Sequence, residues 1–476
     1  MPREYKMLIG GKWISGKQKI YVKNPYNQDV IGAIPQASKS DVDAAIKAAL
    51  KGFVTISNLP AHHRSQILEA TSALIRKHRE ELAELIAKES GKAWKYANGE
   101  VGRAIETFKF AAEEAKQIHG ETVPMDASPN SETRMGFFLR TPVGVIGAIS
   151  PFNFPLNLVA HKVAPAIAAG NSVVLKPATA TPLTALRLGE LLMEAGLPAG
   201  VLNIIIGGGS TVGDWLVTDP RVAMITFTGS PPVGKFIMSR GGLKKYTMEL
   251  GSNSAVIICE DANLKKAIPR CVIGSYANSG QVCISVQRIY VHQSVFDKFS
   301  QLFIDATQKQ VVGDPLERNC DVGPMIDIRE AERAELWVKE AVENGAQILT
   351  GGKRDGAMFE PTVLTKVTPD MKVVKDEIFA PVVAIIPYNN FDDVLHQVDN
   401  SKYGLQAGIY TEKIDRAFKA IKKINVGGII INDVPTFRVD HMPYGGNKES
   451  GIGREGLKYA IEEMTNIRMV CFNLDS

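Results

Sequence analysis

The sequence has few of the features that mark secreted or metal-binding proteins. Its 476 residues include only five cysteines: Cys259, Cys271, Cys283, Cys320 and Cys471. They are too few and too scattered for a disulfide framework, and no two have the C-x-x-C spacing typical of zinc sites. We therefore expect no bound metal, and a reducing, cytoplasmic environment in which one thiol is free for catalysis.

An excess of charge of one sign and a long hydrophobic run are also lacking. The chain has 55 Lys and Arg against 51 Asp and Glu, a net charge of +4. Proteins that bind nucleic acid or membrane surfaces usually carry a larger or more clustered excess. No apolar run of signal-peptide length follows Met1, and the most apolar stretch, Pro151 to Leu175, is interrupted by His161 and Lys162. We therefore expect neither a membrane nor a nucleic-acid partner.

The composition, 45% hydrophobic and 22% charged, is that of an ordinary globular protein. A single hydrophobic core stops growing at roughly 250–300 residues, so two or more domains are expected. Short strand patterns occur near residues 7–13 and 21–26. Apolar residues at helical spacing predict helices over 41–53, 64–90 and 100–120.

From Pro142 onward the pattern changes to alternating strands and helices. Brief β-branched apolar runs are each followed by Gly- or Pro-rich punctuation and a helical pattern, which indicates parallel βαβ units. These runs lie at residues 143–149, 172–175, 201–206, 224–227, 254–258, 288–291, 382–386 and 427–431. The pattern predicts two interlocked α/β domains that meet near residue 250.

One strand of the first half ends in residues that suit a dinucleotide. Lys176 and Thr179 follow the run 172–175, at the place where a dinucleotide fold meets the adenine ribose. An acidic side chain there repels a 2′-phosphate, and the sequence offers none nearby, so NADP has room. The alternative is that Lys176 is a surface lysine that simply follows a strand.

Two glycine-rich turns, at residues 207–213 and 229–234, also follow strands. Neither has the G-x-G-x-x-G spacing of the common dinucleotide fingerprint. The second turn puts backbone amides and a hydroxyl at the start of a helix, where a diphosphate can bind. Either turn alone is equally explained by the steric need for glycine after a strand.

Cys283 follows a polar turn, Asn278-Ser-Gly-Gln, and a small inert core residue is one interpretation of it. Four other motifs favour a catalytic role. They are Ser150-Pro-Phe-Asn-Phe-Pro, Met248-Glu-Leu-Gly-Ser-Asn, Lys375-Asp-Glu-Ile-Phe-Ala-Pro and Pro443-Tyr-Gly-Gly-Asn-Lys-Glu-Ser-Gly. In these motifs and their order, from about Leu8 to Met469, the sequence resembles the aldehyde dehydrogenase superfamily.

The resemblance implies oxidation of an aldehyde to a carboxylic acid with three catalytic residues. Cys283 as thiolate attacks the aldehyde carbon to give a thiohemiacetal. The side-chain amide of Asn153 and the backbone N–H of Cys283 match the oxyanion hole of the family. Hydride transfer to the nicotinamide leaves a thioester, and Glu249, 34 residues before the cysteine, matches the general base that activates water to hydrolyse it.

The resemblance also assigns the cofactor site. Glu377 and Phe379 match the pair that positions the nicotinamide ribose and ring. The further matching contacts are Ser150, Pro151, Phe152, Lys176, Thr179, Gly209, Gly213, Gly229, Ser230, Val233, Leu250 and Gly251.

Two departures from the family pattern bear on these assignments. The usual E-L-G-G is here Glu249-Leu-Gly-Ser252, a small change at a turn that leaves Glu249 in place. Members that prefer NAD carry a glutamate at the position of Thr179, so we expect NADP to be preferred, with NAD possible. The presence of Glu249 speaks against the CoA-acylating semialdehyde branch, which lacks that base.

In finer detail the motifs around Cys283 and Asn432 resemble the lactaldehyde, sulfolactaldehyde and NADP-dependent non-phosphorylating glyceraldehyde-3-phosphate dehydrogenase group. A short polar or anionic aldehyde is therefore expected, with succinate semialdehyde as an alternative. Arg438 or Arg103 is a candidate clamp for an anionic group; alternatively Arg438 pairs with Asp440 or with a neighbouring subunit. The candidate substrate residues are Asn153, Phe154, His161, Arg103, Ser285, Phe437 and Arg438.

The resemblance implies a Rossmann-like cofactor domain (residues 1–121 and 141–249), a catalytic domain (250–440) and a small β oligomerisation element (122–140 and 455–476). An exposed strand near Ile467–Phe472 would pair with another subunit, giving a homodimer or homotetramer. A non-catalytic nucleotide-binding relative would be expected to lack Cys283 or Glu249. A cysteine hydrolase would have no use for the glycine-rich cofactor turns.

Overall fold

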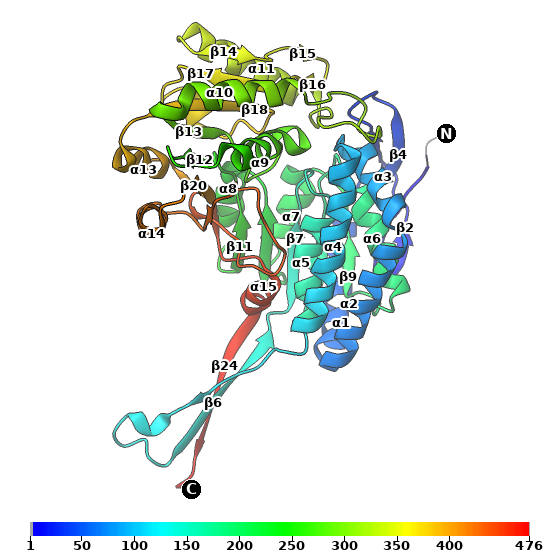
Figure 1. Ribbon diagram of the computed structural model, residues 1–476. Coiled ribbons are helices and arrows are strands. Elements are labelled where there is room, and N and C mark those ends of the chain that lie inside the picture. Colours follow the sequence, from blue (N-terminus) through cyan, green and yellow to red (C-terminus); the bar gives the residue numbers. More distant parts are fainter. Residues whose placement is uncertain (1–2, 476) are drawn as a thin grey trace.

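The computed structural model describes residues 3–475, which form two open α/β sheets and a projecting β ribbon (Figure 1). The predicted fold class is thereby confirmed. The first sheet contains, in spatial order, β2 (Lys12–Ile14), β1 (Met7–Ile9), β9 (Leu202–Ile204), β8 (Ser172–Lys176), β7 (Val145–Ile149), β10 (Met224–Thr228), β11 (Lys245–Glu249) and β23 (Gly451–Ile452). Strands β9, β8, β7, β10 and β11 are parallel, so their carboxyl ends share one edge of the sheet.

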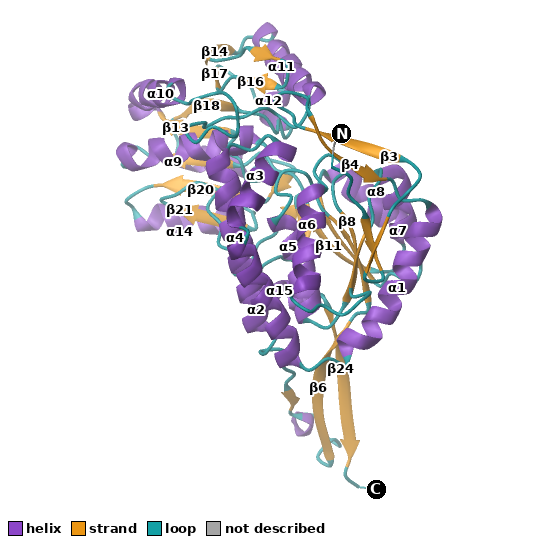
Figure 2. Cartoon of the chain, turned by 90° about the vertical axis from the view of Figure 1, so that its right-hand side faces the viewer, coloured by secondary structure: helices purple, strands orange, loops and turns teal. Residues whose placement is uncertain are grey.

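Helices cover both faces of the first sheet. They are α1 (Lys39–Ser57), α2 (Ala61–Lys77), α3 (Arg79–Ser90), α4 (Trp94–Glu114), α5 (Asn157–Ala168), α6 (Leu183–Glu194), α7 (Asp214–Thr218), α8 (Pro231–Gly241) and α15 (Leu457–Glu463). Figure 2 shows α5 and α6 on one face and α1, α7 and α8 on the other. Because both faces are covered, the central strands are continuous apolar runs rather than alternating ones.

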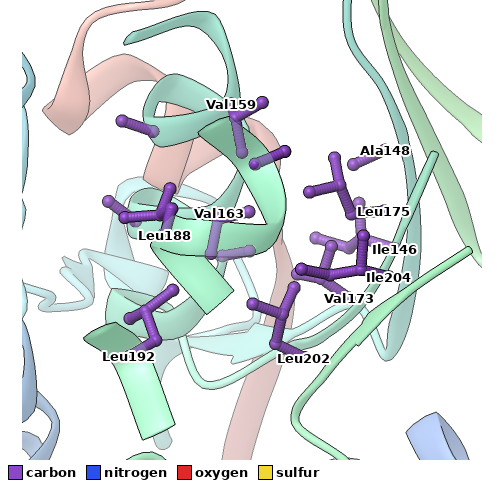
Figure 3. Packing of buried hydrophobic residues seen from close by; sticks show 14 of the residues in the cluster. Ile146, Ala148, Val159, Val163, Val173, Leu175, Leu188, Leu192, Leu202 and Ile204 are labelled. Atoms are coloured by element: carbon purple, nitrogen blue, oxygen red, sulfur yellow. The ribbon is translucent and has the colours of Figure 1, made fainter. Parts of the chain in front are cut away.

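The first core lies between this sheet and helices α5 and α6. Val159 and Val163 of α5 and Leu188 of α6 point toward Ile146 and Val173 of the central strands (Figure 3). All five side chains are buried. Packing of this kind fixes the loop that links β7 to α5.

The second sheet repeats the design with seven strands. They are, in spatial order, β14 (Gln347–Thr350), β17 (Thr362–Thr365), β18 (Val382–Tyr388), β13 (Arg288–His292), β12 (Ala255–Ile258), β20 (Gln406–Tyr410) and β21 (Gly428–Ile431). Its helices are α9 (Leu264–Tyr276), α10 (Gln293–Gln308), α11 (Ile328–Glu343), α12 (Lys372–Lys375), α13 (Phe391–Asp399) and α14 (Ile414–Lys423). Strand β21 forms one edge of the sheet.

A ribbon of long strands projects from the body and ends near the carboxyl terminus (Figure 1). It consists of β5 (Thr122–Val123), β6 (Arg134–Pro142) and β24 (Thr465–Asn473). Strand β24 includes residues 467–472, where a strand was predicted near the end of the chain. Three two-stranded sheets complete the strands: β3 (Lys19–Lys23) with β4 (Val30–Pro35), β15 (Arg354–Asp355) with β16 (Met358–Phe359), and β19 (Tyr403–Gly404) with β22 (Asn447–Lys448). Helix α15, just before β24, packs into the first core through Leu457 and Ile461.

The single helix predicted over residues 64–90 is two helices. The chain turns at His78, whose φ of −100° and ψ of 24° end α2 and begin α3. The His78 ring contacts Glu81 and Arg187, and Glu80 and Glu81 lie in the first turn of α3, where acidic side chains stabilise a helix start. Apolar spacing alone does not register such a break.

None of the helices within residues 3–475 combines the length and apolar character needed to cross a membrane.

A buried ion pair supports the loop between β7 and α5. Glu100 on α4 bonds to the ammonium of Lys92, and both side chains are fully buried. The other carboxylate oxygen of Glu100 accepts hydrogen bonds from the backbone N–H groups of Leu156 and Asn157, at 2.8 and 3.0 Å. Glu100 therefore caps the start of α5 from a neighbouring helix.

We predict that Glu100→Ala destabilises the protein by about 3–5 kcal/mol, because it leaves the Lys92 charge buried and unpaired. Urea unfolding followed by circular dichroism measures this loss. Glu106→Ala on the same helix removes an exposed partner of Lys109 and is expected to change stability by less than about 1 kcal/mol. Equal effects of the two substitutions would contradict the capping role.

Candidate active site

A cavity of about 460 Å³ opens between the carboxyl edge of the first sheet and the segments that lead into strands β13 and β18 of the second sheet. Its lining includes Asn153, Glu249, Cys283, Glu377 and Phe379, which come from four separate motifs of the sequence. The other predicted cofactor contacts on its wall are Ser150, Pro151, Phe152, Gly229, Ser230, Val233, Leu250 and Gly251. The fold thus brings together residues up to 229 positions apart in the chain, from Ser150 to Phe379.

The loop that carries Cys283 has a strained, fixed backbone. Asn278 and Ser279 have φ angles of 53° and 56°, and Gly280 one of 70°. A Cβ on Gly280 would lie 2.0 Å from the carbonyl oxygen of Ala380, so only glycine fits there. The hydroxyl of Ser279 donates to the Gly323 carbonyl at 2.7 Å. Strain of this kind persists where the surroundings hold it, and it is frequent at functional sites.

The Cys283 sulfur faces an apolar cluster that includes Val282, Ile284 and Leu405. Burial raises the pKa of the thiol to about 11, while a hydrogen bond with Tyr444 opposes that shift. The sulfur lies 3.0 Å from the Tyr444 hydroxyl. The resting Cys283 side chain is therefore mostly a neutral thiol.

Asn153 lies beside the nucleophile in the loop that the buried Glu100 supports. Its side-chain amide donates to the Gln281 carbonyl at 2.9 Å. The Asn278 amide in turn donates to the Asn153 carbonyl at 3.2 Å. An amide NH₂ has two N–H donors, so a second one remains for a developing oxyanion.

Glu249, at the end of β11, is 3% exposed. Neither of its carboxylate oxygens has a hydrogen-bond partner among the described residues. Burial, with the nearby Glu455 carboxylate, raises its pKa well above the usual range. A buried carboxylate with a raised pKa and free lone pairs is suited to accept a proton from water.

Glu377 and Phe379 close the opposite wall. The Glu377 carboxylate accepts a hydrogen bond from the Ser252 backbone at 3.0 Å, and burial raises its pKa to about 7. A Cβ on Gly251 would lie 2.1 Å from this carboxylate, which explains the glycine. The Phe379 ring meets Phe152 edge-on, with centroids 5.9 Å apart.

A second chamber of about 300 Å³ adjoins the first, and Phe227 and Val233 line both. Lys176, Gly209 and Gly213 line it as well. Together the two chambers form an elongated space with a polar end at Glu377 and a largely apolar end at Phe236 and Ile237. These residues fit a dinucleotide.

The residues at the end of β8 could hold an anionic group of a dinucleotide. Lys176 is 5% exposed, and burial lowers the pKa of its amine to about 8. Its ammonium donates to the Pro177 carbonyl rather than to a carboxylate. Thr179 donates to the Gly207 carbonyl at 2.9 Å. Asp214 also lines the second chamber, contrary to the expectation that no carboxylate is near, but Arg240 binds it at 3.0 and 3.1 Å.

The candidate anion clamps are both paired with carboxylates. Arg103 binds Asp440 at 2.7 Å, and His161 binds the same carboxylate at 2.8 Å. Arg438 binds Glu455 at 3.0 Å. The predicted pairing of Arg438 with Asp440 is therefore wrong. The Arg438 guanidinium instead pairs with Glu455, and Asp440 pairs with Arg103 and His161.

The remaining substrate candidates are dispersed. Phe154 packs against the same apolar cluster as Cys283, and the Lys92 ammonium lies 3.7 Å from its ring centroid. The Ser285 hydroxyl donates to the Gly274 carbonyl at 3.2 Å, and Phe437 is 44% exposed. Among the substrate candidates, Asn153 is the one found on the wall of the 460 Å³ cavity in the described part of the chain.

Several residues of the site were not predicted. Tyr444 contacts the nucleophile, and Glu455 neutralises Arg438. Arg333 on α11 lines the cavity and is held by Glu330 at 2.8 Å. Tyr444 belongs to the Pro443-Tyr-Gly-Gly motif, which was a signal for it, but Arg333 stands in an ordinary amphipathic helix.

Four side chains around the site keep buried polar atoms without hydrogen-bond partners within residues 3–475. They are Asn153 Oδ1, His161 Nδ1, both carboxylate oxygens of Glu249, and Arg438 Nε. Buried polar groups are nearly always bonded, so a set of free ones indicates a place for ligand or water.

The whole chain is similar to known proteins. The model of the aldehyde dehydrogenase family matches residues 13–470. A 3-sulfolactaldehyde dehydrogenase of Priestia aryabhattai is 50% identical over 472 residues, 99% of this chain and 98% of the relative.

Two solved structures are also similar. Aldehyde dehydrogenase 21 from Physcomitrella patens, in complex with the reaction product succinate, has a TM-score of 0.98 and 42% identity over 100% of this chain and 99% of that one. A glyceraldehyde-3-phosphate dehydrogenase from Methanocaldococcus jannaschii, complexed with NADP, has a TM-score of 0.92 and 42% identity over 96% and 99%.

The raised pKa of Cys283, about 11, predicts slow alkylation of the resting enzyme at neutral pH. Since the thiolate is the reactive form, the iodoacetamide rate is expected to rise about tenfold per pH unit below the pKa. The rate of inactivation between pH values of about 7 and 10 measures this. Cys283→Ala reports the background from the exposed Cys471. A plateau already reached near neutrality would contradict the prediction.

Proposed function

Because the chain belongs to the aldehyde dehydrogenase family, and such enzymes oxidise aldehydes with NAD(P), we propose that it converts a short polar or anionic aldehyde into the carboxylic acid through a thioester on Cys283. The observation that carries this proposal is the convergence of Cys283, Asn153 and the unpartnered Glu249 carboxylate on one cavity. On the sequence grounds given above, we further propose that it works in the cytoplasm.

The first step is attack of the Cys283 thiolate on the aldehyde carbon, forming a C–S bond and an oxyanion. The free N–H of the Asn153 amide and the backbone N–H of Cys283 stabilise that charge. Bound NAD(P) supplies the acceptor for the hydride that the carbon must lose. Glu377 and Phe379, which line the cavity together with Gly251, would hold the cofactor.

The second step is hydrolysis of the thioester. Glu249 takes a proton from a water molecule, whose oxygen attacks the acyl carbon as the C–S bond breaks. The products are the carboxylic acid and the Cys283 thiolate. The raised pKa of Glu249 makes it a stronger base, but it must be ionised to act, so turnover falls as the pH drops through that pKa.

The substrate proposal rests on the polar side of the site. Arg438 Nε and His161 Nδ1 are buried without partners within the described chain, and Arg103 lies nearby on α4 with its side chain 30% exposed. These groups suit a sulfonate, carboxylate or hydroxyl of a polar aldehyde, although none of the three residues lines the 460 Å³ cavity. The 50% identity to a 3-sulfolactaldehyde dehydrogenase favours sulfolactaldehyde, with lactaldehyde and glyceraldehyde 3-phosphate as related substrates.

Succinate semialdehyde is the second candidate. A structure of 0.98 TM-score holds succinate as its reaction product, which favours a carboxylate-bearing substrate. The presence of Glu249 argues against a CoA-acylating semialdehyde dehydrogenase, because Glu249 can act as the base for hydrolysis of the thioester by water.

We predict that Cys283→Ala abolishes aldehyde oxidation, and that Glu249→Gln lowers kcat by about 10²–10⁴-fold. Since Glu249 acts after the thioester forms, Glu249→Gln is expected to retain one rapid burst of reduced cofactor per site. Stopped-flow absorbance on sulfolactaldehyde, lactaldehyde, glyceraldehyde 3-phosphate and succinate semialdehyde, with and without CoA, measures both. Turnover by Cys283→Ala, or acceleration by CoA, would overturn the proposal.

NADP is the proposed cofactor, supported by the buried Lys176 without a carboxylate partner and by Thr179. We predict that Thr179→Glu moves the ratio of kcat/KM for NADP over NAD at least about tenfold toward NAD, because its carboxylate repels a 2′-phosphate. Thr179→Ser keeps the hydroxyl that bonds Gly207 and serves as the control. An unchanged ratio would mean that Thr179 lies away from the ribose.

We propose a homodimer or homotetramer, with the ribbon as the contact. Ile467, Met469 and Phe472 on β24 are 63%, 46% and 50% exposed, and β21 is an edge strand. Apolar edge strands are usually covered in the native assembly. Multi-angle light scattering is expected to give a multiple of 51.8 kDa. A single monomer peak at micromolar concentration would refute the assembly.

A further inference from the structure

The Tyr444 hydroxyl lies 3.0 Å from the Cys283 sulfur and is buried with it in the apolar cluster of Val282, Ile284 and Leu405. In the described part of the chain it is the one hydrogen-bonding group found on that sulfur. The apolar side chains of this cluster cannot stabilise a thiolate. An anion in such surroundings is stabilised by a hydrogen-bond donor.

We propose that the Tyr444 hydroxyl donates a hydrogen bond to the Cys283 thiolate, making Tyr444 a catalytic residue that promotes ionisation of the nucleophile before the aldehyde binds. This inference rests on the proposed function of Cys283. The proton lost by the thiol leaves to solvent, and no bond to Tyr444 forms or breaks.

The hydroxyl is suited to be the donor. Burial, with the adjacent thiol, raises the pKa of Tyr444 well above its usual value. The phenol therefore keeps its proton over the range in which the thiol ionises. Hydrogen bonds to a charged partner are stronger than those between neutral groups.

Tyr444 is clamped in this position from two sides. Its backbone forms a two-way bridge with Glu455: Tyr444 N donates to Glu455 O at 3.0 Å, and Glu455 N donates back at 2.6 Å. The Arg438 guanidinium lies 3.6 Å from the ring centroid and binds the Glu455 carboxylate at 3.0 Å. The cation over the ring also increases the positive charge on the hydroxyl hydrogen.

The charged groups around the sulfur act in opposing directions. Arg438 favours the thiolate, whereas the carboxylates of Glu377 and Glu249 disfavour it. Tyr444 is the neutral group of this set in contact with the sulfur. Because it contributes a directed hydrogen bond rather than a charge, its removal tests one interaction without creating a buried ion.

Tyr444→Phe in a Cys471→Ser background tests the proposal. The experiment records the rate of iodoacetamide alkylation of the apo protein from about pH 7 to about pH 12, so that the range includes the pKa of about 11. Loss of the hydrogen bond is expected to raise the pH of the inflection by about one unit, so that alkylation below it is about tenfold slower at a given pH. A change in access alone lowers the rate of the thiolate and leaves the pH of the inflection unchanged. No aldehyde is present, so the outcome does not depend on the substrate.

Tyr410→Phe is the matched control, because it removes a buried hydroxyl that has no hydrogen-bond partner within residues 3–475. The pH dependence of its alkylation rate is expected to coincide with that of the parent protein.

If Tyr444→Phe fails to fold, replacing Tyr444 by 3-fluorotyrosine keeps the ring and makes the hydroxyl a stronger donor. The inflection of the alkylation rate is then expected at lower pH, because the stronger donor stabilises the thiolate. An unmoved profile in either Tyr444 protein overturns the inference, whereas turnover by Cys283→Ala overturns the function.

Discussion

The buried carboxylate of Glu100 holds the active site in register. It is bonded to Lys92 on one side and to two backbone N–H groups at the start of α5 on the other. The segment it fixes carries Asn153, whose amide and carbonyl are tied in turn to the loop of Cys283. The position of the Asn153 amide relative to Cys283 thus depends on an ion pair buried beside the first sheet. Burying an ion pair costs desolvation energy. Here the pair fixes the position of the loop before α5 rather than adding much net stability.

A second chain of interactions reaches the sulfur from the opposite direction. Lys162 and Arg438 neutralise Glu455, whose backbone fixes Tyr444. Glu249 lies close enough to Glu455 for its pKa to be raised by that charge. The nucleophile and the base therefore share one electrostatic environment, although they belong to the two different steps of the proposed reaction.

The fold was largely predictable because its signals are local. The run 172–175 and the glycine turns after it are visible in the sequence, and they form β8 and the chamber beside Lys176. The division at His78 was not predictable, because it depends on contacts with Arg187, 109 positions away. The partner of Arg438 was missed for the same reason: Asp440 is nearer in sequence, but Glu455 is brought back by the bridge to Tyr444. Sequence motifs indicate which residues lie together in the site. The ion pairs around those residues depend on tertiary packing, which the motifs do not show.

Strand β23 and helix α15 have a consequence for the order in which the protein can be made. Both come from residues 451–463, yet β23 pairs with β11 and Leu457 of α15 lies in the first core. During translation the amino-terminal half emerges from the ribosome without its edge strand and without the helix that covers part of its apolar surface. That half cannot complete its core until almost the whole chain has been synthesised. Until then the nascent chain exposes apolar surface and an unpaired strand edge, both of which favour aggregation.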